Sequence, residues 1–176
     1  MNNPFARRYG KSLIGIWFAF LLFATSVDCQ AQQITTFILA RHAEKVMDGS
    51  KDPLLTEQGI ARAGRLQALL EKASIDAIYT TPFRRTHATV EPLAQAKGIN
   101  VREYEGQKEA AIDDMLKQHA GKTVLVIGHS NTIPEIANWL TGSKQYSDFD
   151  DSDYGNVLII SVLKKGSVAS VTWLRY

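Results

Sequence analysis

The stretch TVLVIGHSN, residues 123–131, is the most informative part of this 176-residue chain for its fold. Its first five residues are apolar or β-branched, which predicts a strand buried on both faces. The strand ends at Gly128, polar residues including His129 follow at once, and a helix is expected over 133–142. In an open α/β sheet ligands bind beyond the carboxyl ends of the strands. The polar turn after this strand is therefore a candidate functional site.

Other short strands and helices alternate along the chain. Strands are expected at 36–40, 77–80 and 100–104, and helices at 57–72, 84–97 and 109–119. A β-hairpin is expected at the end, with strands at 157–163 and 168–173. The first helix, capped by Thr56, should bury an apolar stripe made of Ile60, Ala63, Leu66, Leu69 and Leu70. This alternation predicts an α/β three-layer sandwich with a mainly parallel central sheet, helices on both faces and an antiparallel C-terminal hairpin.

Residues 1–31 are expected to be a signal peptide rather than part of the fold. Basic residues within 7–11 precede an uncharged run over 12–27, and Cys29-Gln30-Ala31 has the small residues of a signal-peptidase site. As a helix the uncharged run would span about 24 Å, less than the ~30 Å of a bilayer core. Cleavage and export to the periplasm or the medium are therefore favoured. A retained membrane anchor and lipidation at Cys29 remain as alternatives.

Composition and charge exclude several classes of protein. The chain has 20 Lys+Arg against 18 Asp+Glu, so a strongly basic nucleic-acid binder is not expected, and its 45% hydrophobic content is that of a globular protein. The only cysteine is Cys29, so disulfides and thiolate chemistry are not expected in residues 32–176, which should form one domain. Two of the four histidines, His87 and His119, fall within predicted helices and are expected at the surface.

Polar side chains follow three of the predicted strands. Arg41 and His42 follow the first, Thr81 and Arg85 the second, and His129 the buried strand described above. Because the carboxyl ends of parallel strands meet at one edge, two imidazoles and two guanidiniums should converge there. A guanidinium group can bind two phosphate oxygens at once through a bidentate pair of hydrogen bonds, and helix N-termini add partial positive charge. The sequence predicts a site for a phosphoryl dianion with no metal and no cofactor; the alternative, two core histidines, explains their matching positions less well.

Three of these segments resemble, in chain order, motifs of the histidine phosphatase superfamily, which is also called phosphoglycerate-mutase-like. They are Arg41-His42-Ala43, Thr81-x-x-x-Arg85-x-x-x-Thr89 and Gly128-His129-Ser130, and LTEQG at 55–59 resembles the family's LTxxG segment. The resemblance runs from about Ile34 to Leu140, with Ala43 in place of the usual glycine.

The resemblance implies a role for each matching residue. His42 would take the phosphoryl group as a phosphohistidine, which water then hydrolyses without a metal. Arg41 and Arg85 would hold the phosphate oxygens, and His129 would donate a hydrogen bond to the developing charge. Arg84 is an alternative to Arg85, although the threonine spacing favours Arg85.

The acid that protonates the leaving group is not identified by these motifs. Members of the family often carry a glutamate after the second helix, where this chain has Glu103 and Glu105. We prefer Glu105, and the pair Asp153-Tyr154 is a further alternative. The substrate rim is expected to include Glu44, Lys45, Glu103, Asn131 and Asp153.

These features together favour an exported phosphomonoesterase that cleaves a small phosphate ester, such as a sugar phosphate, through phosphohistidine. A module that binds phosphorylated ligands without turnover is the alternative from another class. A phosphotransferase of the phosphoglycerate mutase type is less expected, because residues 32–176 leave little room for the longer lid that mutases carry. Neither nucleic acid nor a stable membrane span after signal cleavage is expected.

Overall fold

The computed structural model describes residues 33–176. The predicted signal peptide, its cleavage after Ala31 and the lipidation of Cys29 lie outside the described residues. Within residues 33–176, no helix is both long and apolar enough to cross a bilayer.

The elements of the described chain follow one another in a βα alternation and end in a hairpin. The strands are β1 (Thr35–Arg41), β2 (Ala77–Thr80), β3 (Val101–Glu103), β4 (Thr123–Gly128), β5 (Asn156–Lys164) and β6 (Val168–Arg175). The helices are α1 (Glu57–Leu69), α2 (Arg84–Lys97), α3 (Glu109–Gln118) and α4 (Thr132–Thr141). Each predicted element is present, with bounds shifted by at most a few residues.

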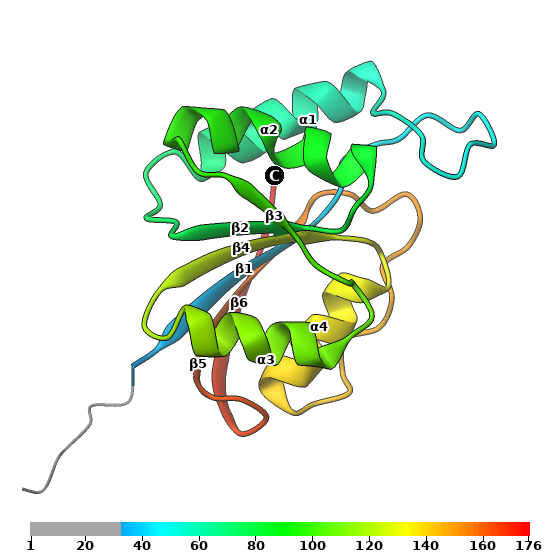
Figure 1. Cartoon of the computed structure of the whole chain (residues 1–176). Coiled ribbons are helices and arrows are strands. Elements are labelled where there is room, and N and C mark those ends of the chain that lie inside the picture. The colour runs from blue at the N-terminus through cyan, green and yellow to red at the C-terminus, as the bar shows by residue number, and fades with distance from the viewer. Residues whose placement is uncertain (1–32) are drawn as a thin grey trace, which may run out of the picture. The chain divides into compact units, whose positions relative to one another are not determined.

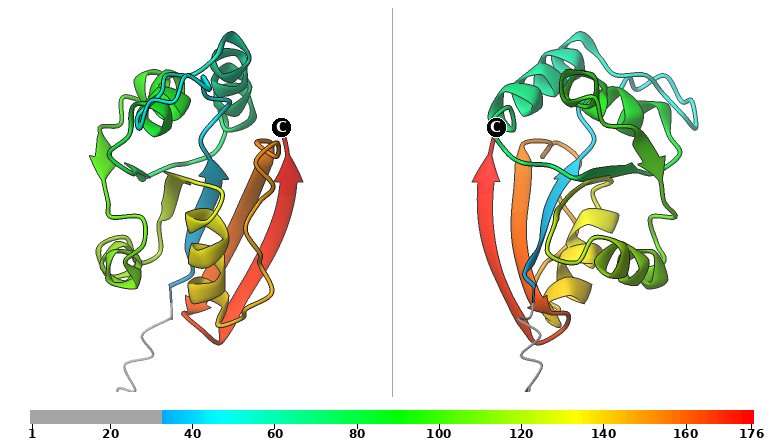
Figure 2. Two further views of the ribbon diagram at one scale, coloured as in Figure 1. Left: turned by 90° about the vertical axis from the view of Figure 1, so that its right-hand side faces the viewer. Right: turned by 60° about the vertical axis from the view of Figure 1, so that its left-hand side comes forward.

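The sheet has the strand order β3-β2-β4-β1-β5-β6. The strands β1 to β4 pair in parallel, whereas β5 runs antiparallel to β1 and forms the hairpin with β6. Helices α1 and α2 cover one face of the sheet and α3 and α4 the other, as Figures 1 and 2 show. The predicted three-layer α/β architecture is therefore confirmed.

Two hydrophobic cores lie on the two faces of the sheet. Along β1, Phe37 and Leu39 belong to the core under α3 and α4, whereas Ile38 and Ala40 belong to the core under α1 and α2. Because successive side chains of a strand point to opposite faces, a central strand covered on both faces must be apolar throughout. This burial explains the uninterrupted apolar runs of β1 and β4.

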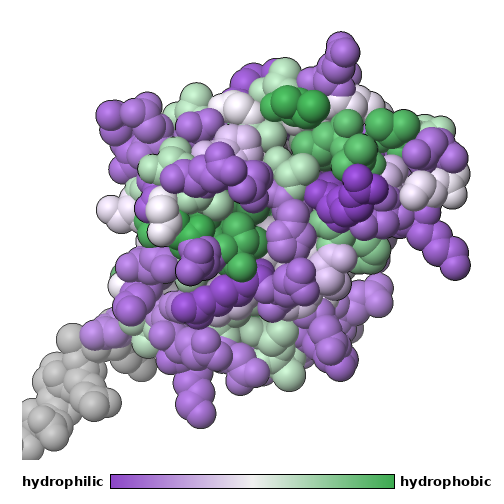
Figure 3. Space-filling model, turned by 45° about the horizontal axis from the view of Figure 1, so that its top comes forward, coloured by the Kyte–Doolittle hydropathy of each residue, from purple (hydrophilic) through white to green (hydrophobic). Residues whose placement is uncertain are grey.

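The apolar stripe of α1 is narrower than predicted. Ala63, Leu66 and Leu70 are buried, but Ile60 is 62% and Leu69 42% exposed. Successive residues of a helix are about 100° apart around its axis, so Ala63, Leu66 and Leu70 share one face. Ile60 and Leu69 lie beyond the two edges of that face. The surface on the α1 and α2 side is mostly hydrophilic with separate hydrophobic patches (Figure 3).

The expected surface position of His119 is also wrong. His119 follows the last residue of α3 and is only 6% exposed, with its Nε2 3.0 Å from the hydroxyl of Tyr79 on β2. Burial lowers the pKa of His119 below its usual value. No local pattern indicates this long-range partner, which makes the ring part of the packing between α3 and the sheet.

Gly59 and Gly64 of α1 form a matched pair for testing the packing of this helix. A Cβ on Gly59 would overlap the main-chain carbonyl of Glu44, whereas a Cβ on Gly64 would meet nothing within 4 Å. We expect Gly59→Ala to lower the free energy of unfolding by about 1–3 kcal/mol. Gly64→Ala should raise it by about 0.5–1 kcal/mol, because alanine favours helix more than glycine does. Urea unfolding measures both, and equal effects of the two substitutions would contradict this account of the packing.

Candidate active site

The pairing of β1 with β4 brings the two predicted site histidines together. Arg41 lies opposite Gly128 in the parallel register, and the His42 amide donates to the Gly128 carbonyl at 2.9 Å. The next residue of each strand end is a histidine, and their ring centroids lie 5.3 Å apart at an interplanar angle of 66°. The two imidazoles thus meet at the carboxyl edge of the sheet.

Two guanidinium groups lie beside these rings. Arg41, the last residue of β1, is only 2% exposed, and Arg85 lies in the first turn of α2 with its Nη2 3.4 Å from His129 Nδ1. Three of their buried nitrogens, Arg41 Nε, Arg85 Nε and Arg85 Nη1, have no hydrogen-bond partner among residues 33–176. Buried donors without partners are costly, so this arrangement is suited to an anion. Arg84, the alternative considered from the sequence, has an exposed side chain.

The environment of His42 fixes its tautomer and its charge. The ring is 3% exposed, and its Nδ1 lies 2.8 Å from the Ala43 carbonyl, which can only accept. The proton is therefore on Nδ1, and Nε2 carries the lone pair. Burial lowers the pKa of His42 to about 3; the hydrogen bond to Ala43 opposes this shift, and the neighbouring charges of Arg41 and Arg85 add to it. His42 is thus a neutral imidazole with a nucleophilic nitrogen at neutral pH.

A short relay of hydroxyl groups holds His129. Its Nε2 lies 2.8 Å from Thr81 Oγ1, which donates to Thr86 Oγ1 at 3.3 Å, and Thr86 in turn donates to the Phe83 carbonyl at 2.7 Å. Because Nδ1 faces the Arg85 donor, Nε2 is the nitrogen that carries the proton. Burial lowers the pKa of His129 to about 4, with the charges of Arg85, Arg41 and Lys45 adding to the effect.

The spacing Thr81-x-x-x-Arg85-x-x-x-Thr89 has a structural explanation. Thr89 Oγ1 accepts from the Ala43 amide at 2.9 Å and donates to the Arg85 carbonyl at 2.7 Å. One side chain of α2 therefore fixes the backbone next to His42 and closes a turn of the helix that carries Arg85. The buried Thr81 and Thr89 connect the second sequence motif to the other two.

Two residues of the site were not assigned a role from the sequence. The Asp52 carboxylate accepts from the Arg84 amide at the start of α2 at 2.9 Å and lies 3.6 Å from Arg85 Nη1. The ring of Phe83 lies 4.3 Å from the Arg85 guanidinium carbon and 5.1 Å from the His129 ring centroid. Phe83 lies between Thr81 and Arg85 of the second motif, so the sequence indicated that this region belongs to the site. The contact of Asp52 joins segments about thirty residues apart and leaves no local pattern.

A cleft of about 640 Å³ opens beside Arg85 and His129. Its wall includes two of the predicted residues, Glu105 and Asn131. Glu105 is exposed and forms an ion pair with Lys108. The remaining lining residues are Thr81, Pro82, Phe83, Gly106, Gln107, Lys108 and Thr132. A molecule bound in this cleft would contact both Arg85 and His129.

Other predicted rim residues lie away from this cleft. Both oxygens of Glu44 lie 2.9 Å from Nε of Arg62, a residue of α1, and both side chains of this ion pair are largely buried. Arg62 holds the pKa of Glu44 below its usual value despite the opposing effect of burial. Glu103 pairs with His87 at 3.1 Å. Lys45 is half-buried and forms an isolated bridge with Leu55.

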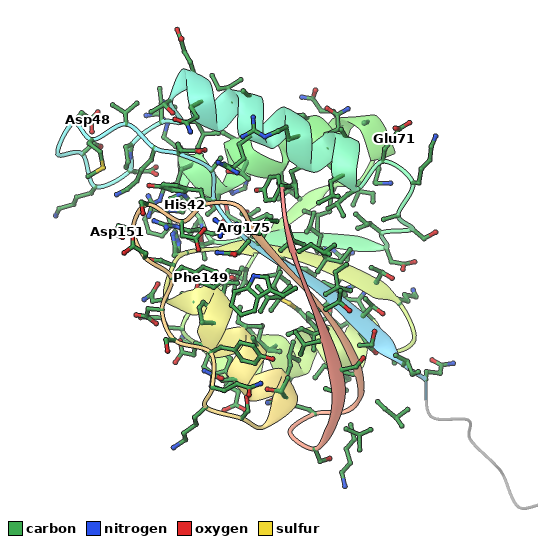
Figure 4. All side chains as sticks on the ribbon, turned by 180° about the vertical axis from the view of Figure 1, so that it is seen from behind. His42, Asp48, Glu71, Phe149, Asp151 and Arg175 are labelled. Carbon is green, nitrogen blue, oxygen red and sulfur yellow. The ribbon has the colours of Figure 1, made fainter. Side chains whose placement is uncertain are left out.

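Asp153, the remaining rim candidate, has both carboxylate oxygens occupied. They accept from Asn156 Nδ2 and from Arg175 Nη2, each at 2.7 Å. Figure 4 shows His42, Asp151 and Arg175 at the same end of the molecule, where the connection from α4 to β5 passes the site. Within residues 33–176 the structure holds no group of three or more His, Cys, Asp or Glu side chains that could bind a metal ion.

Comparison with known proteins agrees with this geometry. Residues 37–111 match the family model described as histidine phosphatase superfamily (branch 1). A curated relative, phosphoserine phosphatase 1 of Hydrogenobacter thermophilus, is 37% identical over 70 residues, which cover 36% of this chain and 33% of the relative. The match thus spans about a third of the length of that relative.

Solved structures share the fold at low sequence identity. A phosphoserine phosphatase from Entamoeba histolytica in complex with 3-phosphoglyceric acid gives a TM-score of 0.64 at 18% identity, covering 81% of this chain and 97% of that one. The protein histidine phosphatase SixA in complex with tungstate gives 0.63 at 16% identity, with 80% and 96% covered. At these identities the likeness establishes the arrangement of helices and strands.

The lowered pKa values of His42 and His129 predict how these rings titrate. In the ligand-free protein, their NMR ring signals should stay those of neutral imidazole from about pH 8 down to about pH 5. Because both pKa values are lowered on folding, the stability that they contribute is complete above the unfolded value of about 6.5 and is lost as the pH falls towards the folded values. A titration midpoint near pH 6.5 for either ring would contradict this description of the site.

Proposed function

We propose that the chain is a member of the histidine phosphatase superfamily, whose model its residues 37–111 match, and that it is a phosphomonoesterase that acts through a phosphohistidine on His42. The observation that carries the proposal is the neutral His42 ring, whose Nε2 carries the lone pair, beside buried guanidinium nitrogens that make no hydrogen bond to any of residues 33–176. A phosphoryl group held by Arg41 and Arg85 would lie next to that nitrogen. Phosphoryl transfer requires little from a protein beyond such positioning and charge stabilisation.

The reaction proceeds in two displacements at phosphorus. His42 Nε2 forms a bond to the phosphorus atom as the bond from phosphorus to the ester oxygen breaks, and the leaving oxygen takes a proton to become an alcohol. Water then forms a bond to the phosphorus of phospho-His42, the N–P bond breaks, and inorganic phosphate leaves. Because the Nε2–H of His129 is directed to Thr81, His129 can donate to the phosphoryl oxygens only from Nδ1, which takes up a proton as the bound dianion raises its pKa.

Glu105 is the proton donor in this proposal. Its place in the cleft wall beside Arg85 and His129 supports the role, because the leaving group must lie on that side of the phosphate. The same carboxylate, after it has lost its proton, accepts one from the attacking water in the second step. Glu103 is the weaker candidate, because it pairs with His87 and does not line the cleft.

The substrate in this proposal is a small phosphate ester, and a sugar phosphate suits the cleft best. The Phe83 ring and Pro82 offer an apolar wall for the C–H face of a sugar, while Gln107 and Asn131 offer hydrogen bonds to its hydroxyls. Export is proposed from the sequence of residues 1–31 alone. A module that binds phosphate without turnover uses the same anion pocket and is distinguished from the enzyme by the next experiment.

Replacing the nucleophile is the direct test of the proposed chemistry. His42→Ala should lower kcat on p-nitrophenyl phosphate by at least about a thousandfold, because no other group can take the phosphoryl group. The wild-type protein mixed with ³²P-labelled substrate and quenched in base should retain label that acid releases, and the variant should retain none. His87→Gln is the matched control and should keep wild-type activity. A wild-type protein that binds phosphate without turnover would support the binding module instead.

The role of Glu105 predicts a dependence on the leaving group. Glu105→Gln should lower kcat on alkyl phosphates such as sugar phosphates by about 10²- to 10⁴-fold, because an alkoxide is a poor leaving group without a proton donor. The effect on p-nitrophenyl phosphate should be small, because p-nitrophenolate leaves without help. Steady-state kinetics on both substrate types measure the difference, with Glu103→Gln as control. Equal losses on the two substrates would exclude Glu105 as the acid.

A further inference from the structure

Arg41 is held by a segment that follows it by more than a hundred residues. Its Nη1 donates to the main-chain carbonyls of Asp150 at 2.8 Å and Asp153 at 3.1 Å. Its Nη2 lies 3.7 Å from the exposed carboxylate of Asp151. With Nη1 directed to the two carbonyls, Nε and Nη2 remain for a phosphate, so the segment determines which edge of the guanidinium faces the site.

The ring of Tyr154 lies against the same guanidinium. The guanidinium carbon of Arg41 is 4.1 Å from the ring centroid, and the ring centroid is 5.9 Å from that of His42. An aromatic face at this distance attracts a guanidinium and favours one orientation of its plane. Tyr154 therefore contacts Arg41 and His42, two residues of the first sequence motif, and restricts the remaining freedom of Arg41.

The segment 149–155 is itself fixed by contacts that do not involve Arg41. The Phe149 amide donates to the Ser130 carbonyl at 3.0 Å, in the turn that follows His129. The Asp150 carboxylate accepts from the amide and the hydroxyl of Ser152, at 2.9 and 2.6 Å. The Asp153 amide closes the turn on the Asp150 carbonyl at 2.9 Å. Such local bonds pre-organise the two carbonyls that receive Arg41.

Tyr154 does not line the leaving-group cleft. The cleft is walled by Phe83 and the turn of Glu105. The neighbouring Asp153 carboxylate is bound by Asn156 and Arg175. Neither residue of the pair is therefore placed to protonate the leaving oxygen, which leaves the contact with Arg41 as the role of the tyrosine ring.

We propose that Tyr154 is a positioning residue: its ring, together with the carbonyls of Asp150 and Asp153, orients the Arg41 guanidinium for the phosphoryl group. The proposal rests on the proposed function, because it concerns the same anion pocket. It predicts that the aromatic face matters and the hydroxyl does not. It also predicts that the effect of the ring passes through Arg41.

The test compares Tyr154→Phe with Tyr154→Leu, and uses Tyr146→Ala as control. Tyr146 belongs to the same connection, but its ring lies 6.0 Å from that of Trp173. Tyr154→Leu should lower both kcat/KM on p-nitrophenyl phosphate and the affinity for inorganic phosphate, measured by calorimetry, by about 5- to 30-fold. Tyr154→Phe should stay within about twofold of the wild-type protein, and Tyr146→Ala should keep its phosphate affinity.

A double-mutant cycle with Arg41→Met separates positioning from general destabilisation. If Tyr154 acts through Arg41, Tyr154→Leu should cost less than about twofold in kcat/KM once Arg41 is replaced. An undiminished loss in that background would overturn the proposal, as would wild-type phosphate affinity in Tyr154→Leu. Equal losses in the phenylalanine and leucine variants would assign the role to the hydroxyl instead. Phosphate binding without turnover in the wild-type protein would refute the proposed function while the affinity measurements still test Tyr154.

Discussion

The parallel pairing of β1 with β4 is the constraint on which the site depends. It places Arg41 opposite Gly128, so that the residues that follow the two strands, His42 and His129, become neighbours. A shift of the register by one residue would turn these side chains to the other face of the sheet. Because both faces of these strands are apolar, it is the close packing of side chains of particular size in the two cores that opposes such a shift. The hydrophobic cores thus determine the geometry of a polar site.

The site concentrates positive charge in a place with little water, and its residues reflect that cost. Burial keeps both histidines neutral, so the guanidinium groups supply the positive charge near the rings. The Tyr154 ring lies against Arg41 and His42. The Phe83 ring lies against Arg85 and His129. Asp52 lies near the second guanidinium, and main-chain carbonyls receive the first. The arginines are therefore held in place before an anion arrives, which lowers the cost of ordering them on binding.

Much of the fold followed from local patterns in the sequence. The strands β1 and β4 could be predicted because both of their faces are buried, and the helices because their apolar positions recur at helical spacing. The exposure of Ile60 and Leu69 shows the limit of this reasoning, since periodicity gives the direction of a face but not its width. The burial of His119 shows another limit, because its partner Tyr79 lies forty residues away in the chain.

The two halves of the site differ in what the sequence can indicate about them. The phosphate-binding half is built at strand ends, where position in the sheet fixes position in space, and its residues form short motifs. The leaving-group cleft is built from the turn around Phe83, the segment 105–108 and the turn at Asn131, which follow the neighbouring strands β2, β3 and β4 but extend beyond their paired residues. The 149–155 segment likewise reaches Arg41 only through the folded chain. Sequence reasoning can therefore predict the class of chemistry, whereas the shape that selects a substrate emerges only when these loops are brought together.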